Sequence, residues 1–207
     1  MADIFEFWSR IRRGENVHPA DGETFARINA KKHGFRLEAL LVRVGADSSI
    51  GGGGWNGPVD AHTGKFVYVA IPETKPVCAG MEKPYSGLDS VLALFGVILP
   101  ARLRMQHMHL DPDFDHLTYG DQGERARQLR TKLKSGDMIV FYSGLLNARS
   151  RSALVYAIVG LFIVDEITQA ADIPIMYRHI NAHSRRMLVP GAEDLVVRAR
   201  RGVSGRL

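Results

Sequence analysis

The sequence predicts an α/β fold, with α+β as the alternative, in one mixed-sheet domain with flanking helices. Apolar runs rich in branched side chains, typical of buried strands, are separated by segments with helical spacing. The chain has 207 residues, 45% of them hydrophobic, which is enough for one compact core. It shows neither an internal repeat nor a low-complexity linker. We therefore expect a helical N-terminal extension over residues 1–34 and a single α/β domain over residues 35–207.

Two helices are expected in the N-terminal extension. Apolar side chains recur near helical spacing close to the N-terminus, at Phe5, Phe7, Trp8 and Ile11. A polar stretch then precedes residues 23–32, which have the pattern of a second helix. Both helices are expected before the first strand of the domain.

The first half of the domain is predicted to contain two strands and a helix. Residues 37–44 are rich in branched apolar side chains and predict the first core strand, and residues 65–71 predict the second. Ser86 and Asp89 stand three residues apart just ahead of an apolar run, which is the pattern of reciprocal capping. A helix is therefore expected over residues 87–97.

A basic amphipathic helix is expected in the second half of the domain. Ala126, Leu129 and Leu133 line one face at helical spacing, and Gly136 is placed to end the helix. The opposite face is cationic and carries Arg125, Arg127, Arg130, Lys132 and Lys134. This pattern is typical of a helix with one buried and one solvated face.

Two strands are expected after this helix. Residues 138–142 predict the first, and the long apolar run 154–164 predicts the second, with Gly160 at a bulge or a close backbone approach. Residues 168–181 are expected to be helical in part, with a break at the proline within them. Residues 187–198 are expected to hold a final hairpin.

The charge of the chain is modestly positive. Lys and Arg outnumber Asp and Glu by 27 to 22, a formal charge of +5, which favours polyanionic partners only weakly. The excess is concentrated in the last third, at Arg149, Arg151, Arg185, Arg186, Arg198, Arg200, Arg201 and Arg206. A phosphate-binding face and a plain solvated surface both fit this pattern. Nucleotide or nucleic acid is thus a candidate partner.

Composition also bears on the compartment. The single Cys78 excludes an intramolecular disulfide and suits a reducing environment. Charged residues interrupt the apolar positions near the N-terminus, which argues against a secretory signal. The longest uncharged run, residues 152–164, is shorter than the about 20 residues that a membrane-spanning helix needs. We therefore expect a cytoplasmic protein without a membrane partner.

One short segment has an ionisable side chain at every second position. The alternating residues are His107, His109, Asp111, Asp113 and Asp115. Because an extended chain turns alternate side chains to opposite faces, the pattern predicts a buried apolar row and a polar row presented on the other face. Same-face positions about 6.5–7 Å apart can share one ion. His107, His109 and Asp111 are therefore candidate ligands of a divalent metal.

Two alternatives to a metal site remain open for this segment. Without a metal, His109 would be a general base held in one tautomer by Asp111 or Asp113. The order Asp-Pro-Asp also favours a structural turn, because the residue before proline is extended and Asp side chains bond nearby amides. The candidate catalytic residues are therefore His109, Asp111 and Asp113. The alternative is that the segment forms only a structural turn.

Substrate-binding residues are expected at two further places. Tyr119 and Gln122 precede the basic helix, whose N-terminal amides are suited to an anion, and would contact a base or sugar. Trp55 lies in the glycine-rich segment 51–57, where it would stack on a nucleotide wrapped by backbone amides. A flexible surface loop or a lid over the substrate is the alternative for this segment.

Several short blocks occur in an order that is similar to a known family. They are Arg43-Val44-Gly45-Ala46-Asp47-Ser48, Phe66-Val67-Tyr68-Val69-Ala70-Ile71-Pro72-Glu73, His109-Leu110-Asp111-Pro112-Asp113, and Ser135-Gly136-Asp137 with Phe141-Tyr142. Over about residues 36–165 the chain resembles the nucleotide modification associated domain, type three. That family is associated with systems that modify or recognise unusual bases, so the resemblance implies a nucleotide context without a defined reaction.

The resemblance also implies a candidate polar cluster. By position its members are Arg43, Asp47, His109, Asp111, Asp113, Tyr119 and Gln122. Arg43 would hold a phosphate, a task for which its forked donors are suited. This chain departs from the family pattern in a longer glycine run, an added His107 and the extension before residue 35.

A second resemblance gives a different kind of function. Residues 133–142 and 156–164 are similar to the paired strands of small barrels that read modified bases. Such modules flip a base into an aromatic-lined pocket and carry out no chemistry. In that case Trp55, Tyr119 and Tyr142 would form the binding site.

Three functions follow for testing. The first is an enzyme of nucleotide or nucleic-acid base modification, with His109 as base or ligand, Asp111 and Asp113 as orienting or metal-binding carboxylates, and a divalent metal as its candidate cofactor. The second is a non-catalytic reader of modified bases or nucleotides. The third is a structural partner within a larger complex.

Overall fold

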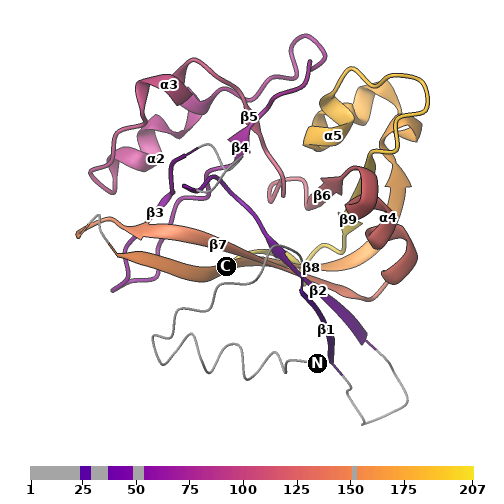
Figure 1. Ribbon diagram of the computed structural model, residues 1–207, viewed down its shortest axis with the longest axis horizontal. Helices are drawn as coiled ribbons and strands as arrows, with labels where there is room; N and C mark the ends of the chain where they lie inside the picture. The colour runs from indigo at the N-terminus through magenta and orange to yellow at the C-terminus, as the bar shows by residue number, and fades with distance from the viewer. Residues whose placement is uncertain (1–23, 29–36, 49–53, 151–152) are drawn as a thin grey trace.

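A mixed β-sheet forms the centre of the molecule (Figure 1). The computed structural model describes residues 24–28, 37–48, 54–150 and 153–207. In spatial order the main strands are β1 (Thr24–Ile28), β2 (Leu37–Arg43), β7 (Met138–Asn147), β8 (Leu154–Gln169), β9 (Leu195–Ala199) and β6 (Thr118–Asp121). Neighbours are antiparallel except β2 and β7, which are parallel. The prediction of a single α/β domain on a mixed sheet is confirmed.

Two short strands and a two-stranded sheet complete the β-structure. β3 (Pro58–Val59) pairs with β7, and β10 (Gly205–Arg206) pairs with β8. β4 (Ile71–Pro72) and β5 (Met108–His109) pair only with each other. This small sheet lies above the main one in Figure 1.

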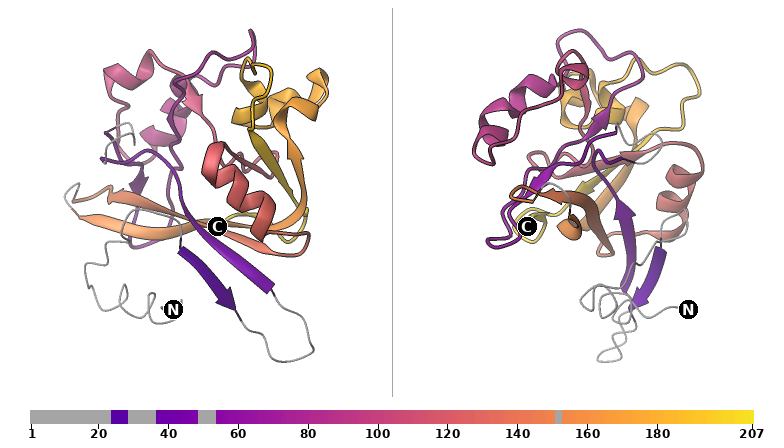
Figure 2. Two further views of the ribbon diagram at one scale, coloured as in Figure 1. Left: turned by 45° about the vertical axis from the view of Figure 1, so that its right-hand side comes forward. Right: turned by 60° about the vertical axis from the view of Figure 1, so that its left-hand side comes forward.

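The helices are short and form two groups. They are η1 (Tyr85–Leu88), α2 (Asp89–Ala93), α3 (Ala101–Arg104), α4 (Gly123–Lys132), η2 (Ala170–Asp172), η3 (Ile175–Ile180) and α5 (Ala182–Arg185). Figures 1 and 2 place α2 and α3 on one side of β4 and β5, and α5 on the other, while α4 lies beside β6. The small sheet therefore connects two helical regions. No helix of the described ranges is long and apolar enough to cross a membrane.

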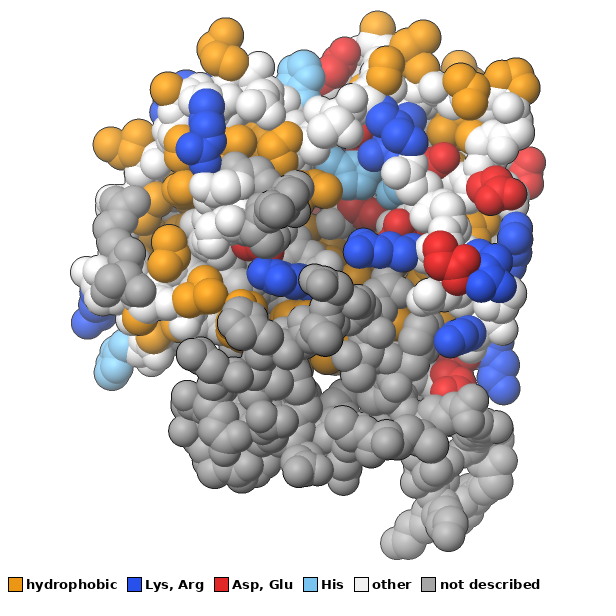
Figure 3. All heavy atoms as spheres, in the orientation of Figure 1, with side chains coloured by type: hydrophobic (Ala, Val, Ile, Leu, Met, Phe, Trp, Pro, Cys, Tyr) orange, Lys and Arg blue, Asp and Glu red, His pale blue; other side chains and the backbone are white. Residues whose placement is uncertain are grey.

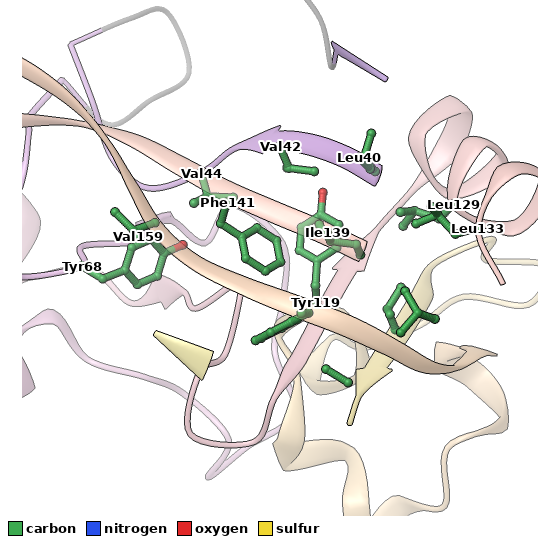
Figure 4. Close-up of a cluster of buried hydrophobic side chains, with 14 of the residues drawn as sticks. Leu40, Val42, Val44, Tyr68, Tyr119, Leu129, Leu133, Ile139, Phe141 and Val159 are labelled. Carbon is green, nitrogen blue, oxygen red and sulfur yellow. The ribbon is translucent and has the colours of Figure 1, made fainter. Parts of the chain in front are cut away.

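The main hydrophobic core covers one face of the sheet (Figure 4). Leu40, Ile139, Phe141 and Phe162 are fully buried there, and Leu129 of α4 packs on the same cluster. Truncating one such leucine to alanine typically costs about 2–5 kcal/mol. A second cluster, around residues 85–103, lies under α2 and α3.

Phe114 fixes the polar segment 107–115 to this core. Its ring packs edge-on against Phe141 and Phe162, at centroid distances of 5.9 and 5.7 Å. A Cβ at position 160 would collide with the Phe114 ring and with the backbone of Gly205, so glycine is needed there. The ladder between β7 and β8 also shifts register opposite this glycine. Both the bulge and the close approach expected at Gly160 are confirmed.

Several other element predictions are confirmed. β7 and β8 include the strands expected over 138–142 and 154–164, and β2 covers residues 37–43 of the strand expected over 37–44. The basic helix is α4, and its apolar side chains, Ala126, Leu129 and Leu133, are buried. The segment 168–181 contains the 3-10 helices η2 and η3, with Pro174 between them.

The helix predicted over residues 23–32 is wrong where it can be compared. Thr24–Ile28 forms β1, paired residue by residue with β2. Its sequence, Thr-Phe-Ala-Arg-Ile, contains branched and aromatic residues that favour strands, and a ready partner outweighs weak helical spacing. The other expected helix, near Phe5, and the rest of 23–32 lie outside the described residues, as does part of the glycine-rich loop.

Three further predictions are corrected. Residues 65–71 form no regular strand apart from Ile71, because their backbone makes only scattered hydrogen bonds, to Pro58, Asp60 and Ala46, and no continuous ladder. The helix expected over 87–97 divides into η1 and the short α2, which ends at Ala93. The expected hairpin over 187–198 is absent, since β9 pairs with the distant strands β6 and β8.

Candidate functional site

The alternating segment directs its polar side chains inward at three positions. His109, Asp111 and Asp113 are buried, while His107 and Asp115 are exposed. The expectation of a buried apolar row opposite a presented polar row is therefore wrong. Regular strand structure ends at His109, and the polar groups are buried because other segments supply partners for them.

Three of the buried side chains form a compact group that we call the trio: His109, Asp111 and His183. One potential ligand atom from each lies within 4.8 Å of the others. Nε2 of His183 is 3.7 Å from an Asp111 carboxylate oxygen, and the two imidazole rings are 4.9 Å apart. Figure 3 shows histidine and acidic side chains together between the α2 and α3 side and the α5 side.

Local structure in β5 and α5 positions the two histidines of the trio. β5 holds His109 in register with Ile71 of β4. His183 lies in the first turn of α5, where the side chain of the N-cap residue Asn181 accepts a hydrogen bond from its backbone amide. Because Asn181 also donates to Asp111, at 3.0 Å, the cap of α5 holds two members of the trio together.

The carboxylate of Asp111 is held by backbone and side-chain donors. Its two oxygens lie 2.9 and 3.0 Å from the backbone amide of Gly120 on β6. A Cβ at Gly120 would lie 2.6 Å from atoms of both Asn181 and His183. Glycine at this position thus allows β6, the α5 cap and Asp111 to approach one another.

Each imidazole of the trio is oriented by its own carboxylate from outside the trio. Nδ1 of His109 donates to Glu73 at 2.5 Å, and Nδ1 of His183 donates to Asp194 at 2.7 Å. A carboxylate on Nδ1 leaves Nε2 as the ring nitrogen available to a metal or a proton. Metal-binding histidines typically have such a carboxylate on the ring nitrogen that does not bind the metal, and both histidines of the trio share this arrangement.

A buried guanidinium connects the two carboxylates. Arg186 donates to Glu73 at 3.1 Å and to Asp194 at 3.2 Å. It also donates to the side chain of Gln122, at 3.2 Å, immediately before α4. Both of its terminal nitrogens lie within about 3.3 Å of an imidazole Nδ1, on His183 and His109. Arg186 thus holds both histidine–carboxylate pairs in one network.

The protonation states follow from burial and these contacts. Burial raises the pKa of Asp111 well above its ordinary value, and burial lowers the pKa of His183. Burial opposes ionisation of Glu73, but the hydrogen bond and charge of His109, with Arg186, outweigh it and lower the pKa to about 2. For Asp194, the bond from His183 likewise outweighs burial and lowers the pKa. The outer carboxylates are thus ionised and the His183 ring is neutral.

Asp113 lies next to the trio in sequence but closes a turn. One of its oxygens accepts from the backbone amides of Asp115 and His116, and the other accepts from Arg185 at 2.5 Å. Its backbone also pairs with Thr118 in both directions. For Asp113 the structure thus supports the turn interpretation, and it does not bring this residue into the trio.

His107, predicted as a metal ligand, lies outside the trio. Its side chain is exposed, and its backbone forms a bridge with Pro84 and accepts from the amide of Glu73. The strand is too short to keep it on the same face as Asp111. Among the predicted ligands, the structure brings together His109 and Asp111, with His183 as the third member.

Arg43, Asp47 and Tyr142 form a second group, on the main sheet. Arg43 and Tyr142 are register partners on β2 and β7, and Arg43 forms an ion pair with Asp47 at 2.6 Å. The guanidinium also lies over the ring of Tyr156, 5.9 Å from its centre. Burial raises the pKa of Tyr142. The single polar cluster implied by the family resemblance is thus divided between two places.

The remaining predicted binding residues differ in their accessibility. Tyr119 is buried against Phe141 and donates to Asp121 at 2.8 Å. Trp55 is half-buried on the cluster under α2 and α3. Gln122 is exposed and accepts from Arg186, so it connects the surface to the trio.

Five contributors were missed at the sequence level: Glu73, Asn181, His183, Arg186 and Asp194. Glu73 closes one of the blocks that resemble the family, and residues 178–186 are unusually dense in His and Arg. No periodicity connects these segments to residue 109. Long-range pairing of β4 with β5 and the fold of α5 bring them together.

The fold and the site together define the class of protein. It is a mixed-sheet domain with a buried pair of histidines and a carboxylate. The chain belongs to the family of the nucleotide modification associated domain 3, whose family model matches residues 38–206. No curated protein and no solved structure matches the chain. The family resemblance identified from the sequence is confirmed, and it connects the chain with nucleotide modification systems.

Proposed function

We propose that the protein is an enzyme that modifies a nucleotide or a nucleic-acid base at a divalent metal centre formed by the trio. The observation that carries this proposal is the convergence of His109, Asp111 and His183, with a carboxylate behind each imidazole. Family membership supports the nucleotide context. The ligand set replaces the His107, His109 and Asp111 set expected from the sequence.

The donor atoms fit one ion. Metal–nitrogen and metal–oxygen bonds in such sites are about 2.0–2.2 Å, so two ligand atoms of one ion lie up to roughly 4 Å apart. The separation of 3.7 Å between His183 Nε2 and Asp111 agrees with this, and the 4.8 Å limit of the trio requires only a small closing movement. Imidazole and carboxylate together suit zinc, iron and manganese.

The charge of the network also fits a divalent ion. Glu73 and Asp194 share the guanidinium of Arg186, whereas the Asp111 carboxylate accepts from the neutral amides of Gly120 and Asn181. Burying a carboxylate without a compensating charge is costly. A bound cation would stabilise the ionised form of Asp111 that metal binding requires.

Three protein ligands favour a catalytic over a structural role. Structural zinc sites normally have four protein ligands, whereas catalytic sites keep positions open for water or substrate. Two histidines and one carboxylate are also the ligands of many non-haem iron oxygenases. When bound, the ion would supply Lewis acidity or redox chemistry toward the substrate.

The surrounding residues have separate tasks in this proposal. Glu73 and Asp194 hold the protons on the Nδ1 atoms and so direct Nε2 inward. Arg186 keeps both carboxylates in position. Gln122 has its exposed amide beside this network, where it would contact a bound base or sugar.

The reader alternative is weakened by burial of its aromatic residues. Base stacking needs an accessible ring face, but Tyr119 is 4% exposed and Tyr142 is 7% exposed. Trp55 is more accessible, and alone it would provide one side of a pocket. The trio is equally buried, so the preference for the enzyme rests on its converging ligand atoms and not on exposure.

The test measures both the metal content of the protein and the modification of its substrates. The wild-type protein is stripped of metal, reloaded with zinc, iron or manganese, and incubated with DNA, RNA and free nucleotides, which are then digested and analysed by mass spectrometry. We expect about one ion per chain and a nucleoside mass change that requires it. Asp111→Asn should lose both, while the exposed control His107→Ala should keep both.

Two results would contradict the proposal. Metal content equal in wild type and Asp111→Asn would remove the trio as the metal centre. A metal-loaded protein that binds a modified base but leaves every substrate unchanged would favour the reader.

A further inference from the structure

The exposed face of α4 carries a concentration of positive charge. Ala126 and Leu129 face the core, so the cationic side chains of the helix point to solvent. Those exposed side chains are Arg125, Arg127, Arg130, Lys132 and Lys134. Figure 3 shows basic side chains, with some acidic ones among them, on the side where Figure 1 places α4.

The sequence of this segment supplies five cations and one carboxylate. Glu124 is the one carboxylate in residues 123–134, and it pairs with Arg127 at 2.6 Å. The segment therefore accounts for most of the formal charge of +5 on the whole chain. On β9, Arg198 pairs with both Asp165 and Glu166.

A further cation extends the surface beyond the end of the helix. Arg200 is exposed and donates to Ser135 at 2.9 Å. This contact brings the segment after β9 beside the segment after α4. The cationic surface thus combines residues from two segments that are 65 positions apart at the Arg200–Ser135 contact. The fold, and not one charged stretch of sequence, brings them together.

The other end of the helix contacts Arg186, which supports the trio. Gln122 is the N-cap residue of α4, and its side chain accepts hydrogen bonds from Arg186 and from Lys75. A ten-residue helix is about 15 Å long, equal to the rise of about four nucleotides in one strand. The cations therefore extend several nucleotides away from the proposed reaction centre.

We infer that the substrate is a polynucleotide whose phosphate backbone lies along α4, so that one base is presented to the trio near Gln122. This inference rests on the proposed function and narrows its substrate class. A free mononucleotide carries its phosphates next to its base and would not reach the far end of the helix. Lys and Arg side chains that contact phosphates position a nucleic-acid strand without reading its sequence.

The experiment compares binding of a labelled 20-nucleotide single strand, the corresponding duplex and a labelled mononucleotide by fluorescence anisotropy across a salt series. The test variant is Arg130→Glu with Lys134→Glu. The matched control, Lys65→Glu with Arg149→Glu, makes the same charge change at exposed positions near β3 and the β7–β8 turn. Metal content and thermal unfolding are measured on each variant to confirm that it is folded.

We expect the wild type to bind an oligonucleotide at least tenfold more tightly than the mononucleotide. The α4 variant should lose at least tenfold in affinity, and its salt slope should fall by about one for each lost phosphate contact. The control should stay within threefold of the wild type. Metal content should be unchanged in both variants.

The inference and the proposed function fail in different ways. Equal binding by the α4 variant and the wild type, or equal affinity for mononucleotide and oligonucleotide, would overturn the polynucleotide inference and leave the metal centre intact. An Asp111→Asn protein that binds the oligonucleotide normally and retains its metal would overturn the metal centre, while support for the surface of α4 would remain.

Discussion

Two polar groups of this protein differ in how the chain builds them. The trio is assembled from β5, the following loop and α5, and Glu73 and Asp194 support it from two more segments. The Arg43–Asp47 pair is local, four residues apart, and Arg43 is 39% exposed. The family resemblance placed residues of both in one cluster. The comparison shows that a costly, buried convergence of ionisable groups marks a functional site better than a shared list of polar residues.

The largest difference is expected when a member of each group is removed. His183→Ala should lower metal affinity by more than a hundredfold, because two ligands remain where there were three. Arg43→Ala, taken from the other group, should leave metal affinity unchanged. Titration of both proteins with Co(II), followed by its visible absorption, measures this. Equal affinities would remove the contrast between the two groups.

Arg186 tests whether the outer network matters to the trio. Arg186→Met leaves Glu73 and Asp194 buried without their shared cation. We expect metal affinity to fall about 10–100-fold and the free energy of unfolding to fall by about 3–5 kcal/mol. Urea unfolding and Co(II) titration give the two values. The control, Arg198→Met, removes an exposed pair and should cost less than about 1 kcal/mol.

A backbone substitution sharpens the comparison through packing. Gly120→Ala would push a Cβ into Asn181 and His183, and overpacking of this kind costs about 1–3 kcal/mol. Gly87→Ala is the control, since a Cβ at that position meets nothing within 4 Å. Thermal unfolding of the two variants should show a clear loss for the first and little change for the second. The reverse order would contradict the tight approach of β6 to α5.

The smallest effect is expected in the second group. Asp47→Asn removes the charge that faces Arg43. Because Arg43 is partly exposed, its ion pair is screened, and we expect a loss of no more than about 1 kcal/mol in urea unfolding. A loss as large as that of Arg186→Met would mean that this pair is as important to the fold as the trio network.

The sequence predicted two members of the trio, His109 and Asp111, and three neighbouring strands of the sheet, β2, β7 and β8, for physical reasons. Residues 138–142 and 154–164 are long apolar runs, and such runs form strands in almost any context. His109 and Asp111 stood out because ionisable residues rarely alternate so regularly. His183, Glu73 and Asp194 could not be connected to them, because only long-range pairing and the α5 cap bring these segments together.

The errors have the same origin. His107 has the same spacing from His109 as Asp111, but β5 is only two residues long, so alternation does not continue on both sides. Residues 65–71 look like a strand because they are apolar and branched, yet Val67 and Val69 enter one core while Tyr68 and Ala70 enter another. Propensity described burial correctly there but not the hydrogen-bond partner.

The most direct test of the metal centre is a crystal structure of the metal-loaded protein, with anomalous diffraction recorded above and below the absorption edge of the bound metal. We predict a single strong peak within about 2.2 Å of Nε2 of His109, Nε2 of His183 and a carboxylate oxygen of Asp111. An anomalous peak at His107, or none at the trio in a protein that contains stoichiometric metal, would contradict the proposed centre.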